Sequence, residues 1–245
     1  MSMTKRKFAV FDIDGTLFRG GLYRELVLGL MERQAVPQKF IDSSFEKLAI
    51  WQKRGSRDSY DQFEWSLVQA IDSSLVDIPT VVYDEVAERI AAQQLDQVYT
   101  YTRQKLVELK EAGYFLIAIS GSQEELVRPF ALKYGFDAWV GQKYVRDGDK
   151  FTGEIIKTYT DKDVLLRQLV EKFDLSWGGS YAYGDSGGDR HMLDIVEHPV
   201  AFNPTEDLLN LALERGWPVI VERKSVVFEL EKGSDGYVLA HAGKI

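Results

Sequence analysis

The chain has 245 residues, of which 30 are lysine or arginine and 38 are aspartate or glutamate, so its formal net charge is -8. This charge argues against non-specific attraction to nucleic acid or to an anionic membrane surface. With no cysteine and only three histidines, disulfide frameworks, thiolate metal sites and cysteine nucleophiles are excluded, and a multi-histidine metal site is disfavoured. No apolar run approaches the ~18–20 residues of a membrane span, and no signal-type apolar region precedes the first strand. We therefore expect a soluble, cytoplasmic protein without nucleic-acid or membrane partners, whose oligomeric state the sequence leaves open.

Short apolar runs that end in small and polar residues recur along the chain. They lie at residues 8–11, 114–119, 180–183 and 199–202. Helical stretches separate them, a pattern that favours a parallel sheet covered on both faces. We predict an α/β fold with a Rossmann-like, doubly wound parallel sheet. Its polar strand ends would meet at the rim where open α/β sheets bind ligands.

The stretch between the first two strands is far longer than one crossover helix requires. We interpret residues 20–95 as an inserted α-helical cap domain, and residues 1–19 and 96–245 as the core. Trp51 and Trp65 in the insertion either line a substrate pocket or belong to the core of the helical bundle, and the bundle core is the simpler interpretation. Apolar residues recur in the insertion at helical spacing, as Leu22, Leu26 and Leu30; Ile41, Phe45 and Leu48; Tyr60, Phe63 and Leu67; and Val82, Val86 and Ile90.

The turn after the first strand is the most informative feature of the sequence. Asp12 and Asp14 stand one residue apart, Gly15 permits a tight turn and Thr16 offers a hydroxyl. Two carboxylates this close repel each other unless one is protonated or a cation neutralises them. A hard cation such as Mg²⁺ takes carboxylate, carbonyl and water oxygens, which this turn can supply. A plain polar strand exit that caps a helix is the alternative interpretation.

Two further strand ends contribute groups of the same kind. Ser120 begins a glycine-serine turn that leads into a predicted helix, and a hydroxyl with free backbone N–H groups at a helix start forms an anion site. Asp185 and Asp189 place two more carboxylates after the strand at 180–183. Four carboxylates gathered at one rim require a divalent metal to be electrostatically tenable.

At these residues the sequence resembles the haloacid dehalogenase superfamily of hydrolases, and most closely its phosphoserine-phosphatase-like branch, subfamily IB. The motifs that carry the resemblance are DIDGT at 12–16, the apolar strand that closes on Ser120, and GDSGGD at 184–189. The lysine motif of the family corresponds to Lys162, which opens a predicted helix. Lys157 and Lys172 are weaker candidates because neither starts a periodic apolar run.

The resemblance implies a Mg²⁺-dependent phosphomonoester hydrolase that acts on a small phosphorylated metabolite. It implies that Asp12 is the nucleophile, which forms an aspartyl-phosphate, and that Asp14 is the general acid and base. The implied Mg²⁺ ligands are the Asp12 carboxylate, the backbone carbonyl of Asp14 and Asp185, with Asp189 acting through a water molecule or by anchoring the site. The implied phosphate-binding residues are Thr16, Ser120, Gly121 and Lys162.

The sequence departs from phosphoserine phosphatases where those enzymes hold their substrate. The acidic residue that binds the substrate amine is replaced by Gly21, and the arginine that binds the carboxylate aligns with Leu67. We therefore disfavour phosphoserine, and the sequence leaves the substrate and pathway open. A phosphotransferase that uses the same site and a non-catalytic sensor of a phosphate ligand are the alternative functions. Arg19, Glu25, Arg54 and Arg57 are either other substrate contacts or solvated surface charges.

Overall fold

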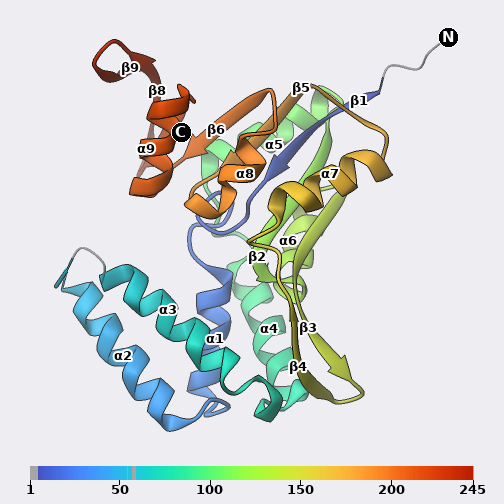
Figure 1. Cartoon of the computed structure of the whole chain (residues 1–245), viewed down its shortest axis with the longest axis vertical. Coiled ribbons are helices and arrows are strands. Elements are labelled where there is room, and N and C mark those ends of the chain that lie inside the picture. The colour runs from blue at the N-terminus through green and yellow to red at the C-terminus, as the bar shows by residue number, and fades with distance from the viewer. Residues whose placement is uncertain (1–4, 54, 57–58, 245) are drawn as a thin grey trace. The chain divides into compact units, whose positions relative to one another are not determined.

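The computed structural model describes residues 5–53, 55–56 and 59–244 (Figure 1). The chain divides into two compact units. The first contains Met1–Gly20, Leu95–Gln142 and Lys157–Ile245, and the second contains Gly21–Gln94 and Lys143–Ile156. The sequence predicted an insertion of residues 20–95 alone, whereas the structure adds the hairpin at 143–156 to the helical unit.

A mostly parallel sheet forms the centre of the first unit, with its strands in the order β3-β2-β1-β5-β6-β7-β8-β9. Strand β1 pairs in parallel with both β2 and β5, so the chain runs outwards through β2 and β3, then returns and continues on the other side of β1. This is the doubly wound order that the sequence predicted. The antiparallel strands β8 and β9 extend it beyond the predicted elements. The strands are β1 (Arg6–Phe11), β2 (Phe115–Gln123), β3 (Ala138–Asp147), β5 (Leu175–Gly184), β6 (His198–Phe202), β7 (Val219–Arg223), β8 (Val226–Gly233) and β9 (Gly236–Lys244).

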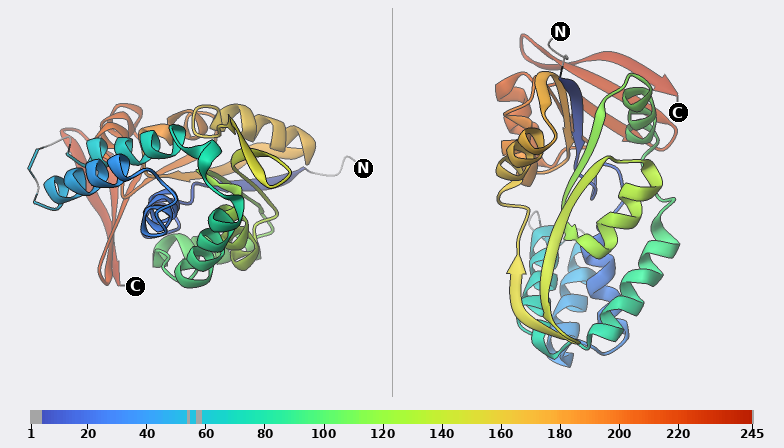
Figure 2. Two further views of the ribbon diagram at one scale, coloured as in Figure 1. Left: turned by 90° about the horizontal axis from the view of Figure 1, so that it is seen from below. Right: turned by 90° about the vertical axis from the view of Figure 1, so that its right-hand side faces the viewer.

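Helices cover both faces of this sheet, α7 and α8 on one side and α5 and α6 on the other (Figure 2). On the first side, apolar side chains of α7, α8 and α9 pack with Phe8 and Val10 of β1 in one buried hydrophobic cluster. On the other side, Phe11 packs edge-on against Phe136, with ring centroids 6.0 Å apart. Because successive side chains of a strand point to opposite faces, the wholly apolar end of β1 serves both layers. The helices are α5 (Thr100–Glu111), α6 (Glu124–Tyr134), α7 (Lys162–Lys172), α8 (Arg190–Leu193) and α9 (Glu206–Arg215), with a 3-10 turn η2 (Gly187–Asp189).

The second unit consists of a helical bundle, residues 21–94, and a β-hairpin, residues 143–156. The predicted stripe of Leu22, Leu26 and Leu30 is fully buried. The stripe of Ile41, Phe45 and Leu48 lies in a helix, as its spacing predicted, but Phe45 is 47% exposed and the buried residues of that helix are Ile41 and Ser44. The elements are α1 (Leu22–Glu32), α2 (Gln38–Gln52), α3 (Ser59–Asp72), η1 (Leu75–Asp77), α4 (Thr80–Gln94) and β4 (Lys150–Ile156), which pairs with the end of β3.

The two tryptophans of this bundle differ in their surroundings. Trp51 stacks on Phe63 with ring centroids 5.7 Å apart, whereas Trp65 is 60% exposed. The bundle-core interpretation therefore fits Trp51 and does not fit Trp65. Within the described part of the chain, no helix combines the length and apolar character needed to cross a membrane.

Candidate active site

The candidate site lies at the carboxyl ends of β1, β2 and β5, where the strand order reverses. Asp12 follows β1, and Asp185 follows β5. Ser120 lies within β2, which continues to Gln123 with a register irregularity after Ile119. Because these three strands are adjacent, residues more than a hundred positions apart in the sequence meet at one rim.

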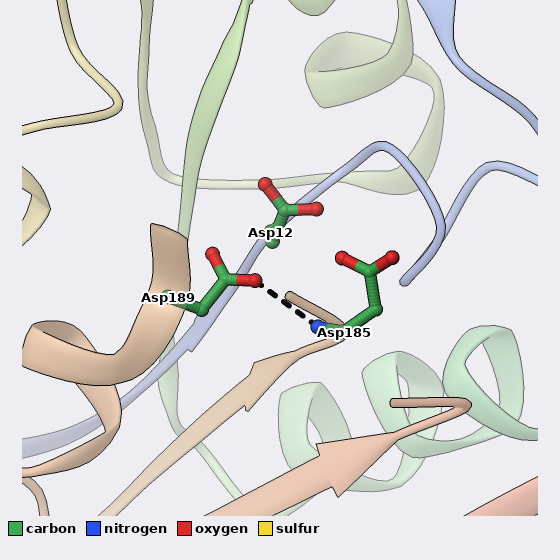
Figure 3. Close-up of side chains that lie close together, drawn as sticks. All are labelled: Asp12, Asp185 and Asp189. Carbon is green, nitrogen blue, oxygen red and sulfur yellow. Dashed lines mark hydrogen bonds between the residues drawn. The ribbon is translucent and has the colours of Figure 1, made fainter. Parts of the chain in front are cut away.

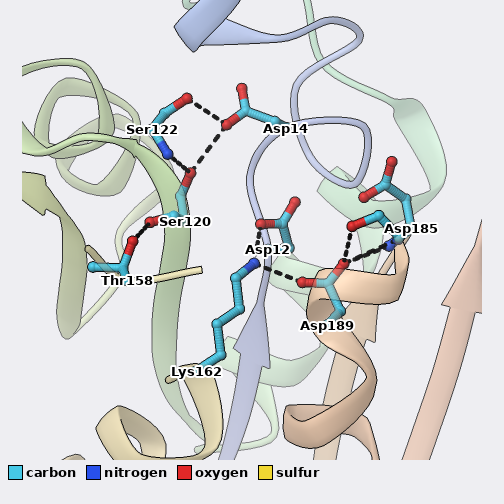
Figure 4. A network of polar contacts seen from close by, with 9 residues as sticks. Asp12, Asp14, Ser120, Ser122, Thr158, Lys162, Asp185 and Asp189 are labelled. Carbon is cyan, nitrogen blue, oxygen red and sulfur yellow. Dashed lines mark hydrogen bonds and ion pairs between the residues drawn. The ribbon is translucent and has the colours of Figure 1, made fainter. Parts of the chain in front are cut away.

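Lys162 joins two of the predicted carboxylates (Figure 4). Its Nζ donates to Oδ1 of Asp12 and to Oδ1 of Asp189, each at 2.6 Å. All three side chains are buried, with Lys162 4% and Asp189 0% exposed. Although burial acts to lower the pKa of Lys162, the two carboxylates outweigh it and raise that pKa above its usual range. The ammonium group is thus fixed in its charged form beside the proposed nucleophile, and Lys162 opens α7 as the sequence predicted.

Asp189 also holds the loop that carries Asp185. Its Oδ2 accepts hydrogen bonds from the backbone N–H of Asp185 at 3.0 Å and of Ser186 at 3.1 Å. The Ser186 hydroxyl completes a capping box with Asp189 at the start of η2. Both oxygens of Asp189 are therefore engaged by the protein, an arrangement that supports an anchoring role.

Three carboxylates of this rim could hold one metal ion (Figure 3). Oxygen atoms of Asp12, Asp185 and Asp189 all lie within 4.8 Å of one another. Burial and the charges of Asp189 and Asp14 raise the pKa of Asp12 from 3.8 to about 8, against the lowering effect of Lys162. Burial, Asp12 and Asp189 likewise raise the pKa of Asp185 well above its ordinary value. The site has too little positive charge for its carboxylates, and an all-oxygen donor set with this deficit fits Mg²⁺.

Asp14 has a separate set of partners (Figure 4). Its Oδ2 accepts hydrogen bonds from the hydroxyl of Ser120 at 3.0 Å and from that of Ser122 at 2.6 Å. The Ser120 carbonyl accepts a hydrogen bond of 2.6 Å from Thr158. Sequence reasoning assigned no role to Ser122 or Thr158. The repeat of serine at 120 and 122 was the available signal for Ser122, whereas nothing local marked Thr158.

Gly15 allows the aspartate turn to lie directly against Asp185. Its φ angle is +77°, and a Cβ atom built there would lie 2.0 Å from Oδ2 of Asp185. A side chain at this position would therefore collide with a proposed metal ligand. The glycine is required both by its backbone conformation and by this close approach.

Several predicted positions gain no partner from the structure. Thr16 is fully buried, and its hydroxyl has no hydrogen-bond partner among the described residues, so its phosphate contact stays a prediction. The phosphate contact of Gly121, which adjoins Ser120, also stays a prediction. Leu67 is fully buried in the helical bundle. Arg54 and Arg57 lie outside the described residues.

Comparison with known proteins identifies the family to which the chain belongs. A family model described as haloacid dehalogenase-like hydrolase matches residues 9–194. A probable phosphatase of Mycobacterium tuberculosis is 27% identical over 238 residues, covering 88% of this chain and 75% of that protein. A histidinol-phosphatase of Neisseria meningitidis is 25% identical over 222 residues, covering 88% of this chain and 98% of that protein.

A solved structure shares the fold. It is a phosphoserine phosphatase with a phospho-aspartyl intermediate analogue, and it matches with a TM-score of 0.60 at 20% identity, covering 90% of this chain and 95% of that one. The family model spans well over half of the sequence, and its match includes Asp12, Ser120, Lys162, Asp185 and Asp189. The chain therefore belongs to the haloacid dehalogenase-like hydrolase family.

Proposed function

We propose that this chain is a Mg²⁺-dependent hydrolase of a small phosphomonoester, working through an aspartyl-phosphate on Asp12. That the chain is a phosphatase follows from its family and from the phosphatases among its relatives. The observation that carries the mechanism is that Asp12 and Asp14 have different hydrogen-bond partners. Asp12 is held by Lys162 among the clustered carboxylates, whereas Asp14 is oriented by two serine hydroxyls.

In the first step, a carboxylate oxygen of Asp12 attacks phosphorus while the bond from phosphorus to the leaving oxygen breaks. Asp14, in its protonated form, gives its proton to that leaving oxygen, so the alcohol departs neutral. Lys162 remains charged throughout and stabilises the negative charge of the transferring group. Ser120 has one hydroxyl proton, which it donates to Asp14 here and would donate to a phosphoryl oxygen instead when substrate is bound.

In the second step, a water molecule attacks phosphorus and the bond from phosphorus to Asp12 breaks. Asp14, now a carboxylate, accepts a proton from that water, which regenerates the free Asp12 and releases inorganic phosphate. Mg²⁺ held by Asp12, Asp185 and the Asp14 carbonyl would neutralise phosphoryl charge in both steps. Asp189 would keep Lys162 and the Asp185 loop in place.

We assign the helical unit, residues 21–94 with the hairpin 143–156, the role of a substrate-selecting cap. The assignment rests on the position of residues 21–94, which are inserted between the first motif and Ser120, where the family that the sequence resembles carries its helical cap. Such caps exclude water from the charged intermediate. Because Gly21 and Leu67 lack the charges that would bind serine, a substrate other than phosphoserine is expected.

A phosphoester panel with Mg²⁺ tests this function, with Asp12→Asn as the diagnostic variant. The wild type should release phosphate from some member of the panel, and Asp12→Asn should lose at least about 10⁴-fold in turnover while keeping its circular dichroism spectrum. Asp96→Asn, a change at an exposed aspartate, is the control and should retain activity. Activity in Asp12→Asn comparable to the control would refute the assigned nucleophile.

The same panel separates the alternative functions. Transfer of phosphate to an added alcohol, in preference to water, would identify a phosphotransferase. Binding of phosphoesters without turnover of any of them by the wild type would identify a sensor.

A further inference from the structure

Arg19 is a charged group near the site that the proposed mechanism does not use. It stands on the loop that follows Asp12 and Asp14, and its side chain is exposed. Among the described residues it pairs with no carboxylate, and its guanidinium carbon lies 5.4 Å from the centroid of the Tyr99 ring. An exposed arginine without a carboxylate partner is available to an anionic ligand.

The backbone around Arg19 is tied to the segment that carries Tyr99. The Arg19 N–H donates to the carbonyl of Gln97 at 2.8 Å, and the Tyr99 N–H donates to the carbonyl of Leu17 at 2.9 Å. Tyr99 in turn packs edge-on against Phe202, with ring centroids 5.0 Å apart. The guanidinium therefore rests on a ring that is itself fixed at the end of β6, which reduces the conformational freedom lost when a ligand binds.

The same loop is anchored beside the reaction centre. The carbonyl of Gly20 accepts a hydrogen bond of 3.0 Å from the N–H of Gly15, and Gly15 lies directly against the Asp185 carboxylate. From the other side, the N–H of Thr205, which follows β6, donates to the Asp185 carbonyl at 2.8 Å. Arg19 thus belongs to the rim that carries the proposed nucleophile and metal ligands.

Resting on the proposed function, we propose that Arg19 is a specificity-determining residue that binds a second anionic group of the substrate. The preferred substrates are then phosphomonoesters that also carry a carboxylate or a second phosphate. A guanidinium offers paired N–H donors to either group. Even with Lys162 and a bound Mg²⁺, the four aspartates leave this rim with a negative formal charge, which would repel a second anion if Arg19 were absent.

Matched pairs of phosphoesters test this inference. The first pair is 3-phosphoglycerate and glycerol 3-phosphate, which differ in a carboxylate against a hydroxymethyl group. The second pair is propane-1,3-diol bisphosphate and the corresponding monophosphate. Comparing the two pairs distinguishes a carboxylate ligand from a phosphate ligand.

We expect the wild type to prefer the second-anion member of at least one pair in kcat/KM. Arg19→Gln should reduce that preference about 10- to 100-fold, mainly through KM, as loss of a charge-assisted contact predicts. Arg19→Lys should restore part of it. Arg167→Gln is the matched control, since Arg167 is also exposed and lies over an aromatic ring, that of Trp177, 5.7 Å away.

Equal loss on both members of a pair would mean that Arg19 only offsets the charge of the aspartates, and would overturn the inference. A wild type without any preference for the second anion would overturn it as well. If the wild type hydrolyses no ester at all, the proposed function fails separately. In that case calorimetric binding of the same pairs to the wild type and to Arg19→Gln applies the same comparison without turnover.

Discussion

The Nζ atom of Lys162 lies 2.6 Å from Oδ1 of Asp12, in a site where both side chains are buried. The two residues are 150 positions apart in the sequence and come from the start of α7 and the end of β1. A second carboxylate, that of Asp189, lies at the same distance from the ammonium group. One cation thus serves two buried anions, and this stoichiometry determines how the site responds to mutation.

Replacing Lys162 should damage both the fold and the reaction. Lys162→Met leaves two buried carboxylates without their cation, and breaking a buried ion pair costs about 3–5 kcal/mol. Turnover should also fall about 10²- to 10³-fold through lost charge stabilisation. Urea unfolding and phosphate release measure the two effects.

Lys133→Met provides the control for that variant. Lys133 pairs with Asp96 at the same distance of 2.6 Å, but the two side chains are 36% and 88% exposed. An exposed ion pair contributes about 0–1 kcal/mol to stability. If Lys133→Met and Lys162→Met lost similar free energies of unfolding, burial would not explain the importance of the Lys162 pair.

Gly15→Ala should impair turnover beyond its effect on stability. A non-glycine residue in the left-handed region costs about 1–2 kcal/mol, and here the new Cβ would also push against the Asp185 carboxylate. A displacement of about 1 Å at a reaction centre can cost about 10²-fold in rate. Gly113→Ala is the matched control, because Gly113 has a φ angle of +84° and nothing within 4 Å of its added Cβ. The two variants should lose stability through backbone strain, but only Gly15→Ala should lose substantial activity.

Ser122→Ala should lower kcat about tenfold by removing the shorter of the two serine hydrogen bonds to Asp14. Asp14 keeps its bond from Ser120, so the loss should be smaller than that from Asp14→Asn. Ser180→Ala removes another buried serine, whose hydroxyl accepts the N–H of Glu197. Steady-state kinetics should show unchanged kcat for Ser180→Ala, and a matching drop there would argue against an orienting role for Ser122.

Removal of Mg²⁺ should make stability depend on pH through Asp12. The pKa of Asp12 is raised to about 8 from an ordinary value of 3.8, so between these values the folded state binds more protons than the unfolded state. The contribution of Asp12 to stability is therefore present at low pH and is lost as the pH rises towards 8. Thermal unfolding in EDTA should show this decline, and Asp12→Asn should reduce it.

Added Mg²⁺ should stabilise the protein increasingly as the pH rises from 5 to 8. Protons and Mg²⁺ compete for the same carboxylates. The apparent affinity for Mg²⁺ should therefore weaken as the pH falls, by up to about tenfold per pH unit for one competing proton. Mg²⁺ stabilisation that is independent of pH over this range would contradict the assignment of Asp12 as a ligand.

The sequence alone determined the elements and the chemistry of the strand ends. The apolar runs before Asp12 and before Ser120 proved to be adjacent parallel strands, and the periodic run after Lys162 proved to be a helix that begins at that residue. These features are local, since strand and helix periodicities involve residues only a few positions apart. Family resemblance could then link the motifs in chain order.

Tertiary structure decided which side chains meet. The bond between Ser122 and Asp14 joins residues 108 positions apart, and only the pairing of β1 with β2 brings them together. The exposure of Phe45 and the burial of Ser44 likewise depend on how α2 packs against α3, where Ser66 offers its hydroxyl to Ser44 at 3.1 Å. Periodicity identifies which face of a helix is apolar, but burial is decided by the neighbour that covers it. The ratio of one lysine to three closely spaced carboxylates is such a consequence of packing, and it leaves the site with an excess of negative charge.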